Sequence, residues 1–134
     1  MIRIDFLGTG NAFTPSGRLH ALTLIDGKIL IDTPPTLITQ LRRKGLKTSE
    51  IEYLLFTHWH ADHTFGFPFF MLERKYISDP KREKDLKIYL RPGGKEKISN
   101  LCNIGFPGSL EDVEKMADWH EEEMCELAGT NWSF

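Results

Sequence analysis

Four side chains that can bind metal lie within one six-residue segment of this 134-residue chain. His58, His60 and His63 are three of its five histidines, and Asp62 adds a carboxylate between the second and the third. Imidazole nitrogens and carboxylate oxygens are the ligands that Zn²⁺ and related ions take at hydrolytic sites. The composition and spacing of the segment therefore predict a metal site rather than four residues with a purely structural role.

The residues before this segment predict how it is positioned. Ile51 to Thr57 is an apolar run typical of a buried strand, so the ligand cluster begins where that strand ends. In extended backbone His58 and His60 point the same way, because side-chain direction repeats every two residues. Asp62 and His63 then fall at the start of the next element and can be directed at a neighbouring point. One short loop could in this way hold two metal ions.

The segment from Thr57 to His63 resembles the His-x-His-x-Asp-His signature of the metallo-β-lactamase superfamily, and it matches at all four ligand positions. Residues 6–10, Phe-Leu-Gly-Thr-Gly, resemble the opening strand and loop of that superfamily. Residues 29–33 are similar to its strand that ends in an aspartate, and residues 64–68 resemble a Gly-x-Pro segment that follows the signature. These segments are most similar to the branch containing ribonuclease Z and related phosphodiesterases.

The resemblance implies specific roles for the ligand residues. His58 and His60 would bind one metal, and Asp62 and His63 a second, with Asp62 also taking part in catalysis. The implied cofactor is zinc, as two ions that share a bridging hydroxide for attack on phosphorus or a carbonyl carbon. For Asp32 we expect a place beside the site, accepting a hydrogen bond from a ligand or from water on the metal. The alternative for Asp32 is a turn-forming aspartate before the following Thr-Pro pair.

The resemblance also implies a fold larger than this chain. The superfamily fold is a four-layer αββα sandwich of two similar halves, and its remaining ligands, two histidines and a bridging aspartate, come from the second half. The two other histidines here, His20 in a predicted strand and His120 in a predicted helix, are expected to be packing residues. We therefore expect residues 1–134 to be one partial domain, the N-terminal half of the sandwich. With the C-terminal half and its ligands absent, metal binding should be weak or undetectable and turnover should be lacking.

Three functions remain open at this point. The first is a metal-dependent hydrolase, specifically a phosphodiesterase similar to ribonuclease Z, that acts on RNA or a small phosphodiester. The second is a non-catalytic half-fold or dimerisation module, and the third is one subunit of a split hydrolase. The apolar side chains of Ile2, Ile4, Phe6 and residues 54–56 must be buried, and half a sandwich lacks the second half that would bury them. We therefore expect a homodimer or a partner chain that completes the sandwich.

The composition excludes several other classes. A net charge of −2 and a pI near 6.2 give no strong electrostatic footprint for nucleic acid, although a local patch would suffice for RNA. Cys102 and Cys125 lack a zinc-binding Cys-x-x-Cys pattern and are expected to be reduced packing residues. No signal peptide precedes the first strand and no apolar stretch approaches the ~20 residues that cross a membrane. A cytoplasmic protein with no membrane contact is the expectation.

Hydrophobic periodicity and turn residues predict the remaining elements. Asp26-Gly27 is typical of a hairpin turn. The strands are expected at 2–7, 20–26, 28–32, 53–57 and 87–90, and the helices at 34–44, 69–77 and 109–127, with a further strand beginning at 131. Residues 78–85 are expected to form an exposed, charged excursion. This alternation favours an α/β domain, a mixed sheet with helices on one face.

Overall fold

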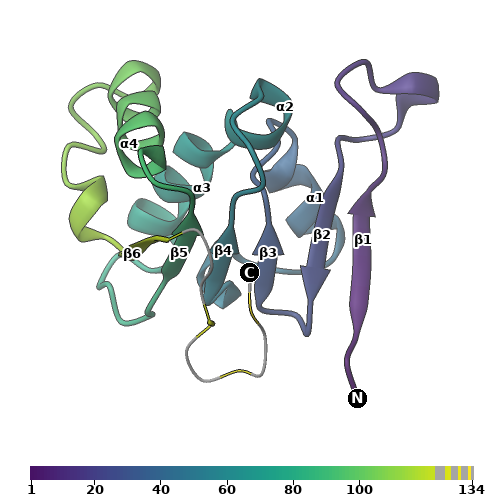
Figure 1. The fold of residues 1–134 in the computed structure, drawn as a ribbon, viewed down its shortest axis with the longest axis horizontal. Coiled ribbons are helices and arrows are strands. Elements are labelled where there is room, and N and C mark those ends of the chain that lie inside the picture. The colour runs from purple at the N-terminus through teal and green to yellow at the C-terminus, as the bar shows by residue number, and fades with distance from the viewer. Residues whose placement is uncertain (123–125, 128–129, 131–132, 134) are drawn as a thin grey trace.

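One six-stranded mixed sheet organises the chain in the computed structural model, which describes residues 1–122, 126–127, 130 and 133 (Figure 1). The strands lie side by side in chain order: β1 (Ile4–Gly8), β2 (Leu22–Ile25), β3 (Ile29–Ile31), β4 (Tyr53–Leu55), β5 (Lys87–Leu90) and β6 (Asp118–Glu121). The first three strands pair antiparallel, and β3 to β6 pair parallel. The predicted mixed sheet is confirmed.

In the described part of the chain, four α-helices accompany the sheet (Figure 1). They are α1 (Leu37–Arg43), α2 (Ala61–Thr64), α3 (Phe67–Glu73) and α4 (Gly94–Gly105), with short 3₁₀ turns at Pro15–Gly17, Thr48–Glu50 and Val113–Lys115 and a π turn at Arg74–Ser78. Among the described residues, none of these helices is long and apolar enough to cross a membrane. The helix predicted at 34–44 corresponds to α1 and the helix predicted at 69–77 to α3 with its π turn.

The predicted hairpin joins β2 to β3 at Asp26-Gly27. Both turn residues have positive φ, 51° at Asp26 and 71° at Gly27, and the Lys28 amide donates to the Ile25 carbonyl at 3.1 Å. Aspartate and glycine tolerate this left-handed conformation better than other residues, which is why the dipeptide specifies the turn. The hairpin fixes the register that ends β3 at the position of Asp32.

The main core lies between the sheet and its helices. The sheet contributes buried leucines and isoleucines from alternate positions, and α1, α3 and α4 contribute Leu37, Leu41, Phe70, Met71, Ile98 and Cys102. Cys102 is fully buried, so its predicted packing role is confirmed. Burial raises the pKa of its thiol from an ordinary value of 9.0 to about 12, because the thiolate would lose its hydration. Cys125 lies outside the described residues.

The opposite face of the sheet is covered unevenly. Near its centre, Ile29, Tyr53, Leu55 and Tyr89 form a second buried cluster to which Leu127, 1% exposed, also belongs. At the β1 edge, by contrast, the apolar side chains of residues 2, 4 and 6 are 60%, 51% and 71% exposed. The apolar run at 54–56 is therefore buried, whereas the apolar side of the first strand faces solvent.

Arg74 connects the segments that precede β4 and β5. Its Nη1 donates to the carbonyls of Thr48 and Ile51 at 2.6 and 3.0 Å, and its Nη2 donates to those of Lys84 and Asp85, both at 3.1 Å. The side chain is buried, and burial lowers the pKa of the guanidinium below its ordinary value. One planar cation thus joins the segment before β4 to the segment before β5.

Two predictions for the second half of the chain are wrong. Residues 109–127 do not form one helix: a 3₁₀ turn at Val113–Lys115 is followed by β6, which pairs parallel with β5. The physical reason is that strand pairing supplies backbone hydrogen bonds there, while α4 already covers this part of the sheet on the helical side. The α4 helix itself was not predicted. Residues 123–125 of the predicted helix and much of the strand expected from 131 lie outside the described residues.

Candidate metal centre

The carboxyl end of β4 carries the predicted ligand segment (Figure 1). His58 and His60 follow the strand in the loop, and His60 is the residue immediately before α2. Asp62 and His63 lie in the first turn of α2, so the chain turns between the two pairs as the spacing predicts. The imidazole of His58 lies 4.7 Å from that of His60 and 4.1 Å from that of His63, measured between ring centroids. The three rings are therefore neighbours.

Asp32 lies next to the ring of His63. The residue is 4% exposed, and its carboxylate accepts three hydrogen bonds: Oδ1 from the Thr57 amide at 2.8 Å, and Oδ2 from the Thr57 hydroxyl at 2.6 Å and from His63 Nδ1 at 2.7 Å. The Asp32 backbone has a φ of 68°, which a turn requires and aspartate tolerates. Both readings of this residue thus describe its geometry, since it turns the chain after β3 and also accepts a bond from His63.

Thr57 extends this network to His58. The Thr57 hydroxyl lies 2.9 Å from His58 Nδ1 and has only one proton, which the 2.6 Å contact assigns to Asp32. His58 must then donate from Nδ1 to the threonine oxygen, as His63 donates from Nδ1 to Asp32. In a neutral imidazole a protonated Nδ1 leaves the lone pair on Nε2. The network therefore directs the lone pair of both histidines to Nε2, and His63 Nε2 lies 3.3 Å from Asp62 Oδ2.

Backbone hydrogen bonds hold the ligand segment against the end of β3. The Thr33 amide donates to the His63 carbonyl, and the Gly66 amide donates to the Thr33 carbonyl, both at 2.8 Å. A Cβ at Gly66 would lie 2.0 Å from the Pro34 carbonyl oxygen, so only glycine permits this approach. Because α2 has only four residues, these backbone contacts hold it in position.

Trp59 lies between His58 and His60 in the sequence, but its side chain packs against the main core. Its ring packs 6.2 Å from that of Phe56 and is in such close contact with Gly94 that a Cβ there would lie 2.3 Å from the indole. Lys97 Nζ lies 5.7 Å from the centroid of the same ring. The predicted packing of Trp59 against the scaffold is confirmed.

The two remaining histidines lie elsewhere. His20 forms an isolated bridge with Gly10 and is half-buried, as predicted. His120 is on β6 rather than on a helix, and its ring stacks on Tyr89 at 4.6 Å. The sequence did not predict the role of Thr57 in this network. The only signal for it is a hydroxyl group between the strand and His58. Within the described part of the chain, no three His, Cys, Asp or Glu side chains converge closely enough to hold a metal ion.

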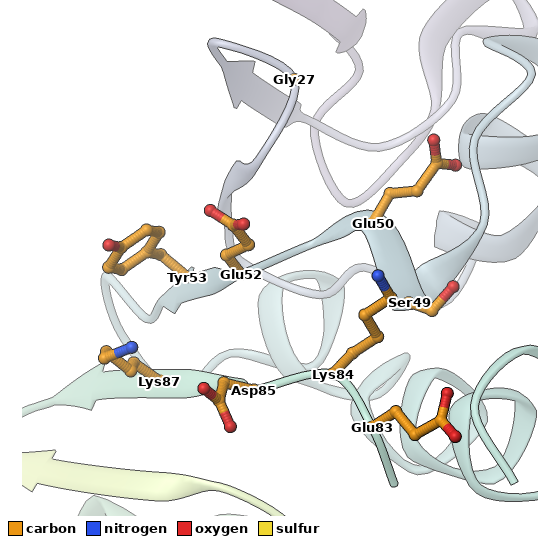
Figure 2. A pocket seen from close by; sticks show the side chains of 9 residues that line it. All are labelled: Gly27, Ser49, Glu50, Glu52, Tyr53, Glu83, Lys84, Asp85 and Lys87. Atoms are coloured by element: carbon orange, nitrogen blue, oxygen red, sulfur yellow. The ribbon is translucent and has the colours of Figure 1, made fainter. Parts of the chain in front are cut away.

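A separate hollow of about 480 Å³ lies at the other end of the sheet, where β4 and β5 begin (Figure 2). It is lined by Gly27, Ser49, Glu50, Glu52, Tyr53, Glu83, Lys84, Asp85 and Lys87. Several of its charges already have partners, including a Lys28–Glu52 ion pair at 3.7 Å and a Glu50 carboxylate bonded to the Lys47 amide. None of the residues predicted to bind metal lines this hollow.

Known proteins match most of this chain. The family model described as anti-Pycsar protein Apyc1 matches residues 2–126. Ribonuclease Z of Pyrococcus abyssi is 32% identical over 116 residues, which are 84% of this chain and 37% of that protein. Ribonuclease Z of Methanocaldococcus jannaschii is 30% identical over 108 residues, 78% of this chain and 33% of that protein. The chain thus spans little more than a third of the length of these relatives.

A solved structure agrees in fold. The short form of human tRNase Z superposes with a TM-score of 0.67 at 24% identity, and the match covers 90% of this chain and 45% of that one. This likeness supports the predicted fold class, a mixed sheet with helices that corresponds to part of a metallo-β-lactamase fold. The chain belongs to the family of the anti-Pycsar protein Apyc1, in the ribonuclease Z-like branch of the metallo-β-lactamase superfamily.

Proposed function

We propose that this chain contributes one side of the active site of a metal-dependent hydrolase, a phosphodiesterase similar to ribonuclease Z. His58, His60, Asp62 and His63 are its metal ligands, and Asp62 also takes part in catalysis. The observation that carries the proposal is the hydrogen-bond chain from His58 through Thr57 to Asp32 and back to His63, which directs the Nε2 lone pairs of two adjacent rings toward a metal, with Asp62 Oδ2 3.3 Å from His63 Nε2.

The donor set supports zinc as the proposed metal. Imidazole nitrogens with one carboxylate suit zinc, and a histidine ligand that donates its other ring proton to a carboxylate is the usual arrangement at such sites. A divalent ion bound there supplies Lewis-acid stabilisation of charge on the substrate and lowers the pKa of water. In this role Asp32 holds the proton of His63 on Nδ1, and Thr57 imposes the same tautomer on His58.

We propose further that these residues make up only part of the ligand set. A catalytic zinc usually has three protein ligands besides water, and no three donors converge among the described residues. The chain also spans about a third of the length of its ribonuclease Z relatives, as the 37% coverage of the Pyrococcus abyssi protein illustrates. The remaining donors would come from a second sheet layer, supplied by further chain or by a partner. The substrate would be RNA or a small phosphodiester.

Metal affinity and turnover, measured together, test this proposal. The purified chain is titrated with Zn²⁺ against a chromophoric chelator and assayed with bis(p-nitrophenyl) phosphate. We expect weak zinc binding that His58→Ala and His63→Ala each reduce at least tenfold, no change for the control His20→Ala, and no steady turnover. Zinc binding that neither variant weakens would contradict the assigned ligands. Two tightly held ions per chain with steady hydrolysis would contradict the incomplete ligand set.

A further inference from the structure

A strip of aromatic, apolar and basic side chains runs along one flank of α4. It begins at the ligand loop, where Lys97 Nζ lies 5.7 Å from the centroid of the Trp59 ring. Ile104 continues it, because a residue seven positions after Lys97 lies on the same side of the helix. It ends where the ring of Phe106, directly after α4, meets the ring of Phe69 on α3 at 5.3 Å and 88°. We call these five residues the α4 strip.

The far end of the α4 strip is open to solvent. Ile104 is 79% exposed and Phe69 is 50% exposed. The T-shaped contact with Phe106 supports the Phe69 ring and leaves half of the residue accessible. Phe65, two residues after His63, is 51% exposed and adds another ring to the segment that joins α2 to α3. Neighbouring exposed apolar residues of this kind mark an interaction site, whereas single ones do not.

The end of the α4 strip beside the ligand loop is positively charged. Arg91, Lys95 and Lys97 lie within residues 91–97, and within the described part of the chain none of the three forms an ion pair. Two carboxylates are near: Glu96 on α4 itself, and Glu121, which accepts a backbone amide just before α4 at 2.6 Å. The excess of cations makes this a local positive patch on a chain whose net charge is −2.

The α4 strip starts at the candidate metal centre. Trp59 lies between His58 and His60 in the sequence, and a Cβ added at Gly94 would lie 2.3 Å from its indole. This contact holds α4 against the ligand loop, and α4 and α2 lie at the same end of the sheet (Figure 1). From residue 97 to residue 104 a helix rises about 10 Å. That length matches roughly three stacked nucleotides at ~3.4 Å each.

We propose that the α4 strip binds an unpaired segment of an RNA substrate, with a phosphate at Lys97 and a base stacked on Phe69. Sites for single strands combine cations for the backbone with aromatic side chains for the bases, and the strip has both. A small phosphodiester would reach the metal centre without contacting the far end of the strip. The proposal rests on the phosphodiesterase function proposed above, and it favours RNA among the two substrate classes.

Fluorescence anisotropy of a labelled oligoadenylate of about ten nucleotides, titrated with the full chain in EDTA, measures this binding without metal. Phe69→Ala should weaken binding at least fivefold, whereas Phe69→Trp should retain it. Phe6→Ala removes an exposed ring from the other face of the sheet and is the matched control. With an abasic oligomer of the same length, Phe69→Ala should have no effect, because no base is left to stack.

The contact with phosphate has a separate readout. Lys97→Gln should weaken binding of both oligomers and reduce the slope of log Kd against log salt concentration by about 0.7, the value for one phosphate of a single strand. Lys81→Gln, at an exposed loop residue, is the control and should leave the slope unchanged. Circular dichroism checks that every variant is folded.

Three results would overturn the proposal. The first is no RNA binding at protein concentrations up to about 300 µM, and the second is binding that Phe69→Ala and Lys97→Gln both leave unchanged. The third is a duplex that binds as tightly as the single strand, because the bases of a duplex are not free to stack. Because the assay contains no zinc, RNA binding without zinc binding would keep the α4 strip and contradict the metal centre. Zinc binding without RNA binding would do the reverse.

Discussion

Replacing Asp32 by asparagine tests the hydrogen-bond network behind the candidate ligands. The amide keeps the size of the side chain and tolerates the φ of 68°, so the backbone turn survives. The amide oxygen can still accept the Thr57 amide proton. The new NH₂ group then faces two donors, the Thr57 hydroxyl and His63 Nδ1, which the carboxylate accepts at 2.6 and 2.7 Å. The hydroxyl can rotate, whereas His63 must move its proton to Nε2.

The expected cost follows from these contacts. Hydrogen bonds to a charged group contribute about 1.5–3 kcal/mol each, and one to two of them are lost, so the free energy of unfolding should fall by about 1.5–6 kcal/mol. Asp26→Asn is the matched control, because Asp26 also has positive φ and accepts a backbone amide but lies in an exposed turn. Its effect should stay within about 0.5 kcal/mol.

Urea unfolding of the metal-free protein measures both variants, and nitrogen NMR of the histidine side chains reads the tautomer. In wild-type protein we expect the His63 proton on Nδ1, and in Asp32→Asn on Nε2, where it would block metal binding. Zinc affinity should accordingly fall about 10- to 100-fold. A cost of less than about 0.5 kcal/mol for Asp32→Asn, the range of an ordinary surface change, would refute the proposed role of Asp32. So would a His63 proton that stays on Nδ1 in the variant.

Three further predictions concern stability. Arg74→Met removes four hydrogen bonds to backbone carbonyls, two of them buried, and should lower the free energy of unfolding by about 3–5 kcal/mol in urea titrations; Arg82→Met, at an exposed site, is the control. Gly94→Ala drives a methyl group into the Trp59 indole and should cost about 1–3 kcal/mol with a change in tryptophan fluorescence; an unchanged spectrum and stability would argue against that contact. Because burial raises the pKa of Cys102 from 9.0 to about 12, its contribution to stability is present below pH 9 and is lost as the pH rises toward 12. A Cys125→Ser variant isolates its thiol, which should alkylate slowly at pH 8 until urea unfolds the chain.

Local signals account for what the sequence predicted well. Asp26-Gly27 determines its hairpin through two residues that tolerate positive φ, and the ligand segment follows a strand whose three residues are all buried. For Asp32 the sequence left two alternatives of equal weight. Only the fold shows that one residue meets both, because the β3–β4 pairing that brings Thr57 to its carboxylate joins segments 25 residues apart.

Tertiary contacts account for what the sequence did not predict. The buried positions of α4 include Gly94, Ile98, Ser99 and Cys102, which follow helical spacing. Two of the four are glycine and serine, so the hydrophobic pattern is too weak to indicate a helix. In the segment of β6 the apolar spacing fits a helix, yet neighbouring side chains face opposite sides of the sheet: Trp119 packs on Phe67 in the main core, while the next residue stacks on Tyr89. Pairing with β5 decides the outcome there.

The assignment of the three histidine ligands is tested most directly by histidine side-chain NMR during zinc addition. All five imidazoles can be observed in one nitrogen-correlated spectrum, so the two histidines outside the segment serve as internal controls. We expect the Nε2 resonances of His58, His60 and His63 to shift together as zinc is added, whereas those of His20 and His120 stay in place. Shifts confined to His20 or His120, or no shift of His58 and His63 at millimolar zinc, would contradict the ligand assignment.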